Sequence, residues 1–343
     1  MTSPTSIAVV GVSGYTGFEL AKILLRHPAA EALTFYVREP KGAHCLSELF
    51  PQLRGWGQAP VRPLSTEAIA GSGAGTAFLA TPHEVSAEIA PRLVDVGMRV
   101  VDLSGAFRFA AAATFERWYR LPTPHAAWLG QAVYGLPEFY SREIAASRLV
   151  ANPGCYATSV ILALKPVADA GWIAAESQVV CDSKSGSTGA GKELRRDLQF
   201  SELDENCKAY NLFAHRHTPE ITEHSGLAES RVVFTTHLLP VARGILSTIY
   251  VTLGEPQSPQ DVEALLRETY LGRPMVRIWK AGTLPELQHV AHTNFCDIGF
   301  ALDQDGRRLV LVSCLDNLGK GAAGQAVQNF NHLLGIEEHT ALQ

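Results

Sequence analysis

A cysteine near the middle of the chain is the strongest candidate for covalent chemistry. Cys155 follows the run Asn152-Pro153-Gly154, which favours a tight turn because the residue before a proline is pushed out of helical geometry. Residues 157–168 are apolar with few helix breakers and predict a buried helix. Cys155 is therefore expected at a helix N-terminus, where unpaired N–H groups and the helix dipole favour a thiolate. This placement predicts a nucleophile, and a small buried cysteine is the alternative.

The segment His215-Arg216-His217 supplies candidates for proton transfer. A thiol nucleophile needs a partner that takes its proton and later manages protons at the carbonyl, and histidine suits both tasks. We assign this role to His217, which stands just before Thr218-Pro219-Glu220, although spacing alone does not exclude His215. The two histidines could instead ligate a metal, but no cysteine or carboxylate stands at ligand spacing, so no metal site is expected.

A glycine-rich turn opens the chain. Residues 7–10 form a short apolar strand that runs directly into the turn, and residues 18–26 predict a helix after it. A strand, a glycine-rich turn and a helix form the first unit of a dinucleotide-binding fold, in which the backbone approaches a pyrophosphate. The spacing is G-x-x-G-x-x-G rather than the commoner G-x-G-x-x-G. The candidates for cofactor contact in this turn are Gly11, Ser13, Gly14, Tyr15, Thr16 and Gly17.

The end of the next strand indicates which cofactor is bound. The predicted strand 33–37 ends in Arg38, where an NAD enzyme usually carries an acidic residue for the ribose 2′-hydroxyl. An arginine there suits a 2′-phosphate, and Ser13 could add a hydrogen bond. The sequence therefore predicts NADP(H) rather than NAD, with a solvated surface arginine beside Glu39 as the alternative.

Two further strands, 76–80 and 99–103, end in polar residues. Ligands of open α/β sheets bind at the carboxyl ends of the strands. Thr81 and Pro82 follow the first strand and are candidates for cofactor contact. Arg108 follows the second strand and could clamp a carboxylate or a phosphate bidentately, although a structural surface arginine fits the sequence equally well.

The remaining elements of the first half are coarser predictions. Residues 40–75 are rich in Gly, Pro and polar residues, so an irregular excursion is expected. A helix is expected over 84–96, interrupted by Pro91, and a short strand over 149–151 leads to Cys155.

A polar loop follows the first strand of the second half. The predicted strand 178–182 opens into residues 183–192, whose small and hydroxyl side chains are typical of an anion or cofactor pocket. Ser185 and Gly186 are the candidates for cofactor contact, and a flexible solvated loop is the alternative. The loop lacks the Walker A spacing.

Several strands with one clear helix, 258–270, follow in the second half. This pattern favours a largely antiparallel sheet, one face of which often carries a subunit interface. Asn317 follows the last strand and could present its amide to a nicotinamide, or could equally cap a helix at 322–334. The expected strands are 231–235, 247–253, 275–279, 294–302 and 308–315, the last two joined by a hairpin turn at 303–306.

Length and composition limit the class of protein. A chain of 343 residues is too long for one core and favours two domains. The net charge of −5 argues against a nucleic-acid or polybasic membrane partner, and no run of about 18 apolar residues predicts a membrane span. Residues 1–6 lack the pattern of a secretory signal. The six scattered cysteines exclude a disulfide framework or zinc ribbon and fit a reducing cytoplasm.

Taken together, these motifs resemble the type 1 N-acetyl-gamma-glutamyl-phosphate reductases of arginine biosynthesis. The resemblance covers essentially the whole chain, and several motifs in the right order are more specific than any one. One departure is Gly105-Ala106, where many relatives carry Ala-Asp, and it puts in doubt a polar contact near Arg108. The matching stretches are GVSGYTG at 11–17, LATPH at 79–83, DLSGAFR at 102–108, YGLPE at 134–138, NPGCYAT at 152–158, DSKSGSTGAGK at 182–192, HRHTPEI at 215–221, HLLPVARGIL at 237–246 and DNLGKGAAGQAVQN at 316–329.

The resemblance implies both an architecture and a reaction. Residues 1–153 and 316–343 would form a Rossmann-type NADP-binding domain, and residues 154–315 an α+β catalytic and oligomerisation domain with a mostly antiparallel sheet. The implied reaction is NADPH-dependent reduction of a small-molecule acyl phosphate through a thioester on Cys155, by a cytoplasmic homodimer or homotetramer. The implied substrate-binding residues are Arg108, Asn152, His215, Glu220 and Arg243.

Three alternatives remain open. An aspartate-semialdehyde dehydrogenase would share the mechanism, but HRHTPEI and the GYTG form of the turn favour the acetylglutamyl enzyme. A carrier-protein-linked relative of the lysine pathway would have a basic surface, against which the net charge of −5 weighs. A redox-sensing NADP-binding protein with Cys155 as its sensor would need neither a partner histidine nor an anion clamp.

Overall fold

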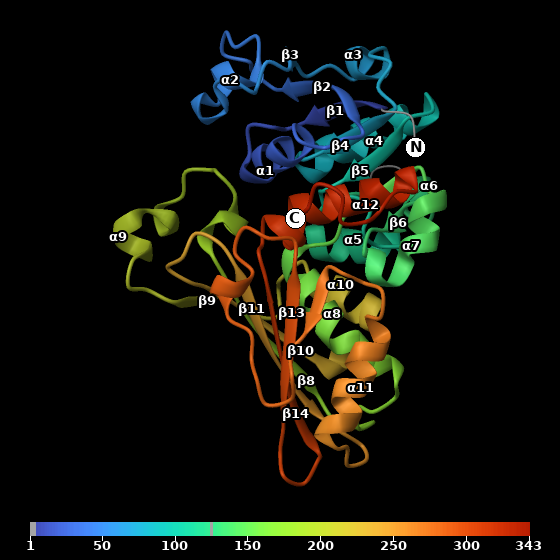
Figure 1. Cartoon of the computed structure of the whole chain (residues 1–343), viewed down its shortest axis with the longest axis vertical. Helices are drawn as coiled ribbons and strands as arrows, with labels where there is room; N and C mark the ends of the chain where they lie inside the picture. Colours follow the sequence, from blue (N-terminus) through green and yellow to red (C-terminus); the bar gives the residue numbers. More distant parts are fainter. Residues whose placement is uncertain (1–4, 124–125) are drawn as a thin grey trace. The chain divides into compact units, whose positions relative to one another are not determined.

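The computed structural model describes residues 5–123 and 126–343. The chain divides into two compact units, Met1–Pro153 with Ala322–Gln343 and Gly154–Gly321. The sequence analysis expected residues 316–343 in the same domain as residues 1–153, whereas residues 316–321 cluster with the second unit. Figure 1 labels the elements of both units.

Unit 1 contains a seven-stranded parallel sheet in the order β3-β2-β1-β4-β5-β7-β6. Its strands are β1 (Thr5–Val10), β2 (Ala30–Val37), β3 (Val61–Pro63), β4 (Thr76–Leu79), β5 (Arg99–Asp102), β6 (Val133–Tyr134) and β7 (Leu149–Ala151). The strand order reverses between β1 and β4, which are neighbours in the sheet although β2 and β3 come between them in sequence. Such a switch point is where doubly wound folds bind their ligands.

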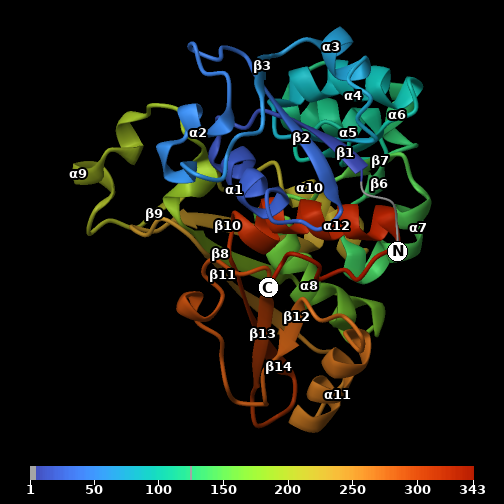
Figure 2. The same cartoon turned by 45° about the horizontal axis from the view of Figure 1, so that its top comes forward.

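Helices connect and cover these strands. They are α1 (Tyr15–Leu24), α2 (Leu46–Leu49), α3 (Thr66–Ala70), α4 (His83–Asp95), α5 (Ala112–Tyr119), α6 (Ala126–Leu129), α7 (Pro137–Ala146) and α12 (Gly324–Leu334), with a 3-10 turn at Pro51–Leu53. The C-terminal α12 packs against α1 and α7 (Figure 2). Residues 40–75 are therefore not an irregular excursion, because α2, β3 and α3 lie within them. Short elements such as these lack the periodicity that would reveal them in sequence.

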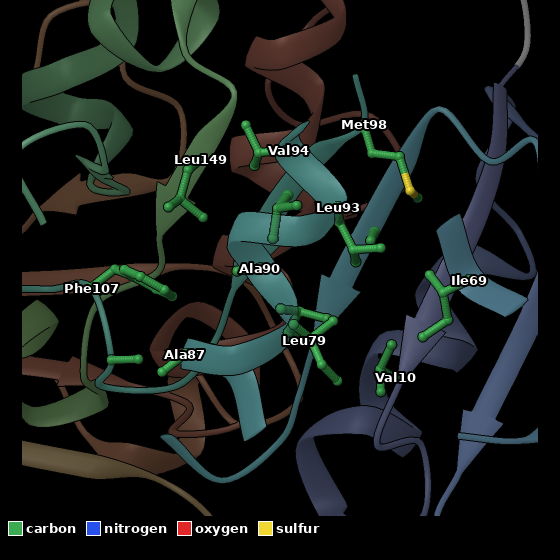
Figure 3. Close-up of a cluster of buried hydrophobic side chains, with 14 of the residues drawn as sticks. Val10, Ile69, Leu79, Ala87, Ala90, Leu93, Val94, Met98, Phe107 and Leu149 are labelled. Atoms are coloured by element: carbon green, nitrogen blue, oxygen red, sulfur yellow. The ribbon is translucent and has the colours of Figure 1, made fainter. Parts of the chain in front are cut away.

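The core of unit 1 follows from helical spacing. Ala87, Ala90, Leu93 and Val94 recur every three or four residues along α4, so they share one face. Figure 3 shows them gathered with apolar side chains of the sheet, such as Leu79 of β4. All five are buried, and this packing holds the carboxyl end of β4 in place.

Unit 2 contains a mixed, mostly antiparallel sheet in the order β12-β13-β14-β11-β8-β10-β9. Its strands are β8 (Val179–Ser185), β9 (Lys208–Tyr210), β10 (Val232–Leu238), β11 (Ile245–Thr252), β12 (Val276–Ile278), β13 (Cys296–Leu302) and β14 (Arg308–Leu315). Only β8 with β10 and β12 with β13 pair in parallel. The predicted hairpin is confirmed, because β13 and β14 pair antiparallel with Leu302 opposite Leu309.

One face of this sheet is covered by α8, which packs against β11 and β14. Along β8 and β10, buried residues alternate with half-exposed ones, as expected for a sheet with one covered face. The half-exposed face is available for a subunit interface. The helices of this unit are α8 (Cys155–Asp169), α9 (Phe200–Leu203), α10 (Thr218–Ser225) and α11 (Pro259–Thr269), with 3-10 turns at Ser187–Ala190, Arg196–Leu198, Glu229–Arg231 and Leu287–His289. A π-helical turn, Gly319–Ala323, begins in this unit and ends in unit 1.

Candidate active site

The predicted nucleophile lies at the N-terminus of α8. Gly154 is the N-cap of this helix, with an extended backbone at φ −70° and ψ 145°, and Cys155 is its first residue. The sequence analysis expected this turn and this helix. No side-chain hydrogen bond caps the helix, and the positive end of the helix dipole at its N-terminus favours an anion near the Cys155 sulfur.

Two glycines permit the close packing around this cysteine. A Cβ on Gly154 would lie 2.3 Å from Nε2 of His217, so the imidazole rests directly against the turn. A Cβ on Gly321 would lie 2.8 Å from the Cβ of Cys155. Any side chain at either position would force a displacement. The structure thus brings together the two residues that the sequence analysis proposed as nucleophile and proton carrier.

Glu220 joins the turn to the histidine. Its side chain is fully buried, and Oε2 accepts a hydrogen bond of 2.9 Å from the N–H of Gly154. The other oxygen, Oε1, lies 3.9 Å from Nε2 of His217. His217 is the N-cap of α10 and Glu220 lies three residues later in its first turn, so both side chains point to the same side of the helix start. The resemblance implied substrate contact for Glu220, whereas this burial suits a residue that positions the turn and the imidazole.

His215 packs beside His217 but has a different environment. The ring centroids lie 4.7 Å apart, and Nδ1 of His215 accepts a hydrogen bond of 3.2 Å from the N–H of His217. Burial, and after it the charges of His217 and Arg216, lower the pKa of His215 to about 2, against a smaller opposing effect of Glu220. His215 therefore stays neutral at physiological pH, which favours His217 as the proton carrier.

A pocket of about 300 Å³ opens onto these groups in unit 2. It brings together five candidates from the sequence analysis, namely Cys155, Ser185, Gly186, His215 and His217. The other lining residues are Tyr156, Gly189, Ala190, Arg195, Asp197, Leu198, Lys208, Tyr210, Asn211, Arg216 and Leu238.

The sequence analysis missed the charged residues of this lining. Arg195, Asp197 and Lys208 lie in a segment without clear periodicity between the polar loop and the histidines. The recurrence of basic residues there, from Lys192 to Arg216, was the available signal. Their convergence on one pocket depends on the pairing of β9 with β10, which is a tertiary contact.

The polar loop after β8 is anchored. The N–H of Gly186 donates to the carbonyl of Gly244 at 2.9 Å, and a Cβ on Gly186 would lie 2.7 Å from the backbone N of Arg243. Asn317 ties the same region together, since its Nδ2 donates to Oγ1 of Thr188 at 2.9 Å and its Oδ1 accepts from the N–H of Gly244 at 2.8 Å. These contacts disfavour the flexible-loop alternative.

Arg243 is part of a buried ion pair and does not line the pocket. Its Nε lies 2.9 Å from Oδ2 of Asp316, and its Nη2 lies 3.0 Å from Oδ1. Asp316 is fully buried and also accepts N–H bonds from Leu318 and Gly319. This arrangement stabilises the turn after β14.

In unit 1, the glycine-rich turn lies between β1 and α1, at the switch point of the sheet. Gly11 has φ +86°, and a Cβ there would lie 2.2 Å from the carbonyl oxygen of Ala80. A Cβ on Gly17 would lie 2.4 Å from the carbonyl oxygen of Gly11. The turn is a compact backbone cradle before the N-terminus of α1, and this shape fits a pyrophosphate.

Other cofactor candidates surround this turn. Gly14 is the N-cap of α1, and Tyr15 and Thr16 form its first turn. Arg38 is exposed directly after β2, at the carboxyl end where a 2′-phosphate would be recognised. Oγ1 of Thr81 hydrogen-bonds to Oγ of Ser86 at 2.7 Å, and Pro82 is the N-cap of α4. Ser13 is exposed within the turn itself.

Arg108 and Asn152 lie together in unit 1. The Nε of Arg108 donates to the carbonyl of Asn152 at 2.9 Å, and Nη2 donates to the carbonyl of Leu103 at 3.1 Å. Asn152 is buried, donates to the carbonyl of Ala322 and accepts from Nδ2 of Asn329 at 3.0 Å. Arg108 is therefore a buried arginine that supports the segment leading to Cys155, and the surface-arginine alternative is wrong.

Among residues 5–123 and 126–343, no helix has both the length and the apolar character needed to cross a bilayer. The same part of the chain holds no group of three or more His, Cys, Asp or Glu side chains placed to bind a metal ion.

Known proteins match this chain along nearly its whole length. Residues 6–147 match the model "Semialdehyde dehydrogenase, NAD binding domain", and residues 155–317 match "Semialdehyde dehydrogenase, dimerisation domain". A curated N-acetyl-gamma-glutamyl-phosphate reductase from Desulfotalea psychrophila is 45% identical, with 98% of this chain and 97% of the relative covered. The reductase of that name from Geobacter sulfurreducens is 44% identical over the same shares.

Solved structures share the fold at lower identity. Aspartate semialdehyde dehydrogenase II from Vibrio cholerae has a TM-score of 0.73 and 18% identity, over 97% of this chain and 99% of that one. Aspartate semialdehyde dehydrogenase with NADP from Candida albicans has a TM-score of 0.67 and 14% identity, over the same shares. Identity this low supports the fold alone, whereas the curated relatives identify the family. The chain is an oxidoreductase that belongs to the family of N-acetyl-gamma-glutamyl-phosphate reductases.

Proposed function

We propose that this protein reduces N-acetyl-L-glutamyl 5-phosphate to N-acetyl-L-glutamate 5-semialdehyde and phosphate, with NADPH, in the arginine pathway of the cytoplasm. The observation that carries the proposal is the cysteine at the N-terminus of α8 with an imidazole packed against its turn. The curated relatives bear the name of this reaction. The pocket beside Cys155 has the size of a small-molecule site.

The first step is acyl transfer to the protein. His217 takes the proton of the Cys155 thiol, and the thiolate attacks the acyl carbon. A C–S bond forms, the bond from carbon to the phosphate oxygen breaks, and phosphate leaves with that electron pair. N–H groups at the start of α8 stabilise the negative charge that develops on the carbonyl oxygen. The product of this step is a thioester on Cys155.

When bound, NADPH supplies a hydride to the thioester carbon. In this proposal the turn of Gly11, Gly14 and Gly17 holds the pyrophosphate, and Ser13 and Arg38 bind the 2′-phosphate. The remaining cofactor contacts come from Tyr15, Thr16, Thr81, Pro82, Ser185, Gly186 and Asn317.

The last step releases the aldehyde. His217 protonates the oxygen as the thioester is reduced, and a thiohemiacetal results. His217 then takes this proton back, the carbonyl re-forms, and the C–S bond breaks with its electron pair on sulfur. Thiolate is a good leaving group, so Cys155 is regenerated for the next cycle. Glu220 keeps the imidazole and the turn in register throughout.

We further propose that the protein works as a homo-oligomer, either a dimer or a tetramer. The half-exposed face of the sheet in unit 2 supports this, as does the match of this unit to a dimerisation domain. Arg108 and Asn152 are proposed to act near the substrate, whereas the ion pair with Asp316 favours a structural role for Arg243.

The reverse reaction tests the function. NADP should be reduced only when both inorganic phosphate and N-acetyl-glutamate semialdehyde are present, because the thioester must be cleaved by phosphate. Aspartate semialdehyde is the control for substrate identity. If the enzyme turned over aspartate semialdehyde but not the acetylated aldehyde, it would be assigned to another pathway. Silence with every aldehyde, in protein that binds NADPH, would favour the sensor alternative.

A further inference from the structure

Three cationic side chains line the pocket that opens onto Cys155. They are Arg195, Lys208 and Arg216, and we give the name cationic wall to Arg195 and Lys208, which share Asp197 as a hydrogen-bond partner. The only carboxylate among the residues lining this pocket is Asp197. The wall therefore carries an excess of positive charge, which the mechanism described above does not use.

Asp197 fixes the geometry of the wall. Nε and Nη2 of Arg195 donate to its two carboxylate oxygens at 3.0 and 2.7 Å. Nζ of Lys208 donates to Oδ2 and to the backbone carbonyl of the same residue, both at 3.1 Å. Hydrogen bonds from Arg195 and then Lys208 hold the pKa of Asp197 at about 2, so this carboxylate stays ionised and orders both cations.

Donors remain after these bonds are made. One carboxylate balances one of the two cations that it contacts. The hydrogen bonds to described residues account for Nε and Nη2 of Arg195 and leave its Nη1, and they account for two of the three protons on Nζ of Lys208. An Arg–Lys pair held in this way can accept a second planar anion.

We propose that the cationic wall binds the α-carboxylate of the substrate and thereby selects an N-acylated amino acid. This inference rests on the proposed function. The phosphate is bonded to the acyl carbon through one of its oxygens, so it must accompany that carbon to Cys155 and the start of α8. The α-carboxylate is separated from the acyl carbon by a three-carbon chain, and it needs a cationic partner elsewhere in the pocket.

The charge of the wall also predicts a preference for the acetylated nitrogen. An acetamide is neutral at physiological pH, whereas a free α-amino group is an ammonium. An excess of cations attracts the carboxylate and repels an ammonium bonded to the same carbon. The wall therefore favours the N-acetyl compound over an amino-acyl phosphate of similar length.

The reverse reaction separates the two anionic ligands, because phosphate and aldehyde have their own KM values. We expect Arg195→Met and Lys208→Met each to raise the KM for N-acetyl-glutamate semialdehyde about 10- to 100-fold, the effect of losing a hydrogen bond to a charged group. The KM for phosphate should stay within about twofold of wild type, since the wall is assigned to the carboxylate. Lys208→Arg should recover most of the loss.

Arg196→Met is the matched control. Arg196 is exposed, is adjacent to Arg195 in sequence and does not line the pocket, so its loss should leave both KM values unchanged. The second control is the substrate in which a neutral carboxamide replaces the α-carboxylate. Wild type should turn over this analogue poorly. With the analogue, the wall variants should be as active as wild type.

Four results would overturn the assignment. A rise in the KM for phosphate instead of the aldehyde would assign the wall to the leaving group. If the wall variants lost as much activity with the carboxamide analogue as with the natural aldehyde, the carboxylate would not be the ligand of the wall. The same conclusion would follow if Arg196→Met raised the KM for the aldehyde as much as Arg195→Met. A wild type that turns over another aldehyde but not the acetylated one would overturn the proposed function itself, and this inference with it.

Discussion

Each unit contains a helix that begins at a glycine N-cap, α1 at Gly14 in unit 1 and α8 at Gly154 in unit 2, but the two turns differ in what surrounds them. In unit 1, Gly11 and Gly17 allow one stretch of backbone to approach another, and Ser13 and Tyr15 are exposed. In unit 2, Gly154 allows a side chain, the imidazole of His217, to approach the turn. Glycine serves backbone recognition in the first turn and the placement of reactive side chains in the second.

This difference matches two kinds of task. A backbone cradle with a helix N-terminus recognises an anion through N–H groups and tolerates varied side chains. A reactive centre needs a few groups held at fixed separations. The turn before α8 meets that need through Glu220, which contacts both the backbone of Gly154 and the ring of His217. In the proposed function, a glycine-bearing turn at a helix N-terminus thus supports binding in one unit and chemistry in the other.

Removal of the nucleophile should give the largest effect. Cys155→Ser should lower turnover about 10⁴-fold or more, because an alkoxide is not available at neutral pH and no thioester forms. Binding of NADPH, measured by fluorescence titration, should be unchanged, since Cys155 is not among the proposed cofactor contacts. Cys207→Ser, at an exposed cysteine outside the pocket, is the control. Unchanged turnover in Cys155→Ser would exclude the covalent mechanism.

Substitution of the glycine in the second turn should give the second largest effect. Gly154→Ala places a Cβ where Nε2 of His217 now lies, so the imidazole must move, and we expect kcat to fall about 100-fold. Gly130→Ala is the matched control, because a Cβ there meets nothing within 4 Å. If Gly154→Ala and Gly130→Ala had the same kcat, His217 would have no role in the reaction.

Filling the first turn should have a smaller effect of a different kind. Gly17→Ala places a Cβ 2.4 Å from the carbonyl oxygen of Gly11 and should widen the cradle. We expect the KM for NADPH to rise about tenfold, with little change in the rate at which Cys155 is acylated. If Cys155 were acylated slowly in Gly17→Ala while NADPH bound normally, the roles assigned to the two turns would be reversed.

The smallest effect concerns stability and the neutral histidine of unit 2. The pKa of His215 is about 2 in the folded protein against 6.5 unfolded, so unfolding takes up a proton below pH 6.5. Below pH 6.5, the free energy of unfolding should therefore decrease as the pH is lowered, and this residue contributes up to about 1.4 kcal/mol per pH unit. His215→Phe should flatten this slope in urea titrations, whereas the exposed His44→Gln should not.

Much of the site was predictable because its signals are local. The run from Asn152 to Cys155 specifies a turn and a helix start through proline and glycine chemistry, and the cradle of Gly11 to Gly17 does the same. The long strands and helices carried clear apolar periodicity. The short elements within residues 40–75 did not, and they were misread as irregular.

The rest of the site depends on contacts between distant segments. The burial of Glu220 under the turn of Gly154 joins residues 66 positions apart in sequence. Lys208 reaches the pocket because β9 pairs with β10 at the edge of the sheet. The partner of Arg243, Asp316, lies 73 residues away. No local pattern specifies such pairings, so roles that rest on them could not be read from sequence.

The measurement that tests the central claim most directly is acylation of the protein without NADPH. The enzyme would be mixed with N-acetyl-glutamyl phosphate alone, quenched in acid, and analysed by peptide mass spectrometry together with an assay for released phosphate. We predict one N-acetylglutamyl group on the peptide that carries Cys155, with stoichiometric phosphate, and neither in Cys155→Ser. Release of phosphate only when NADPH is present, with no adduct on Cys155, would contradict the division of tasks between the two turns.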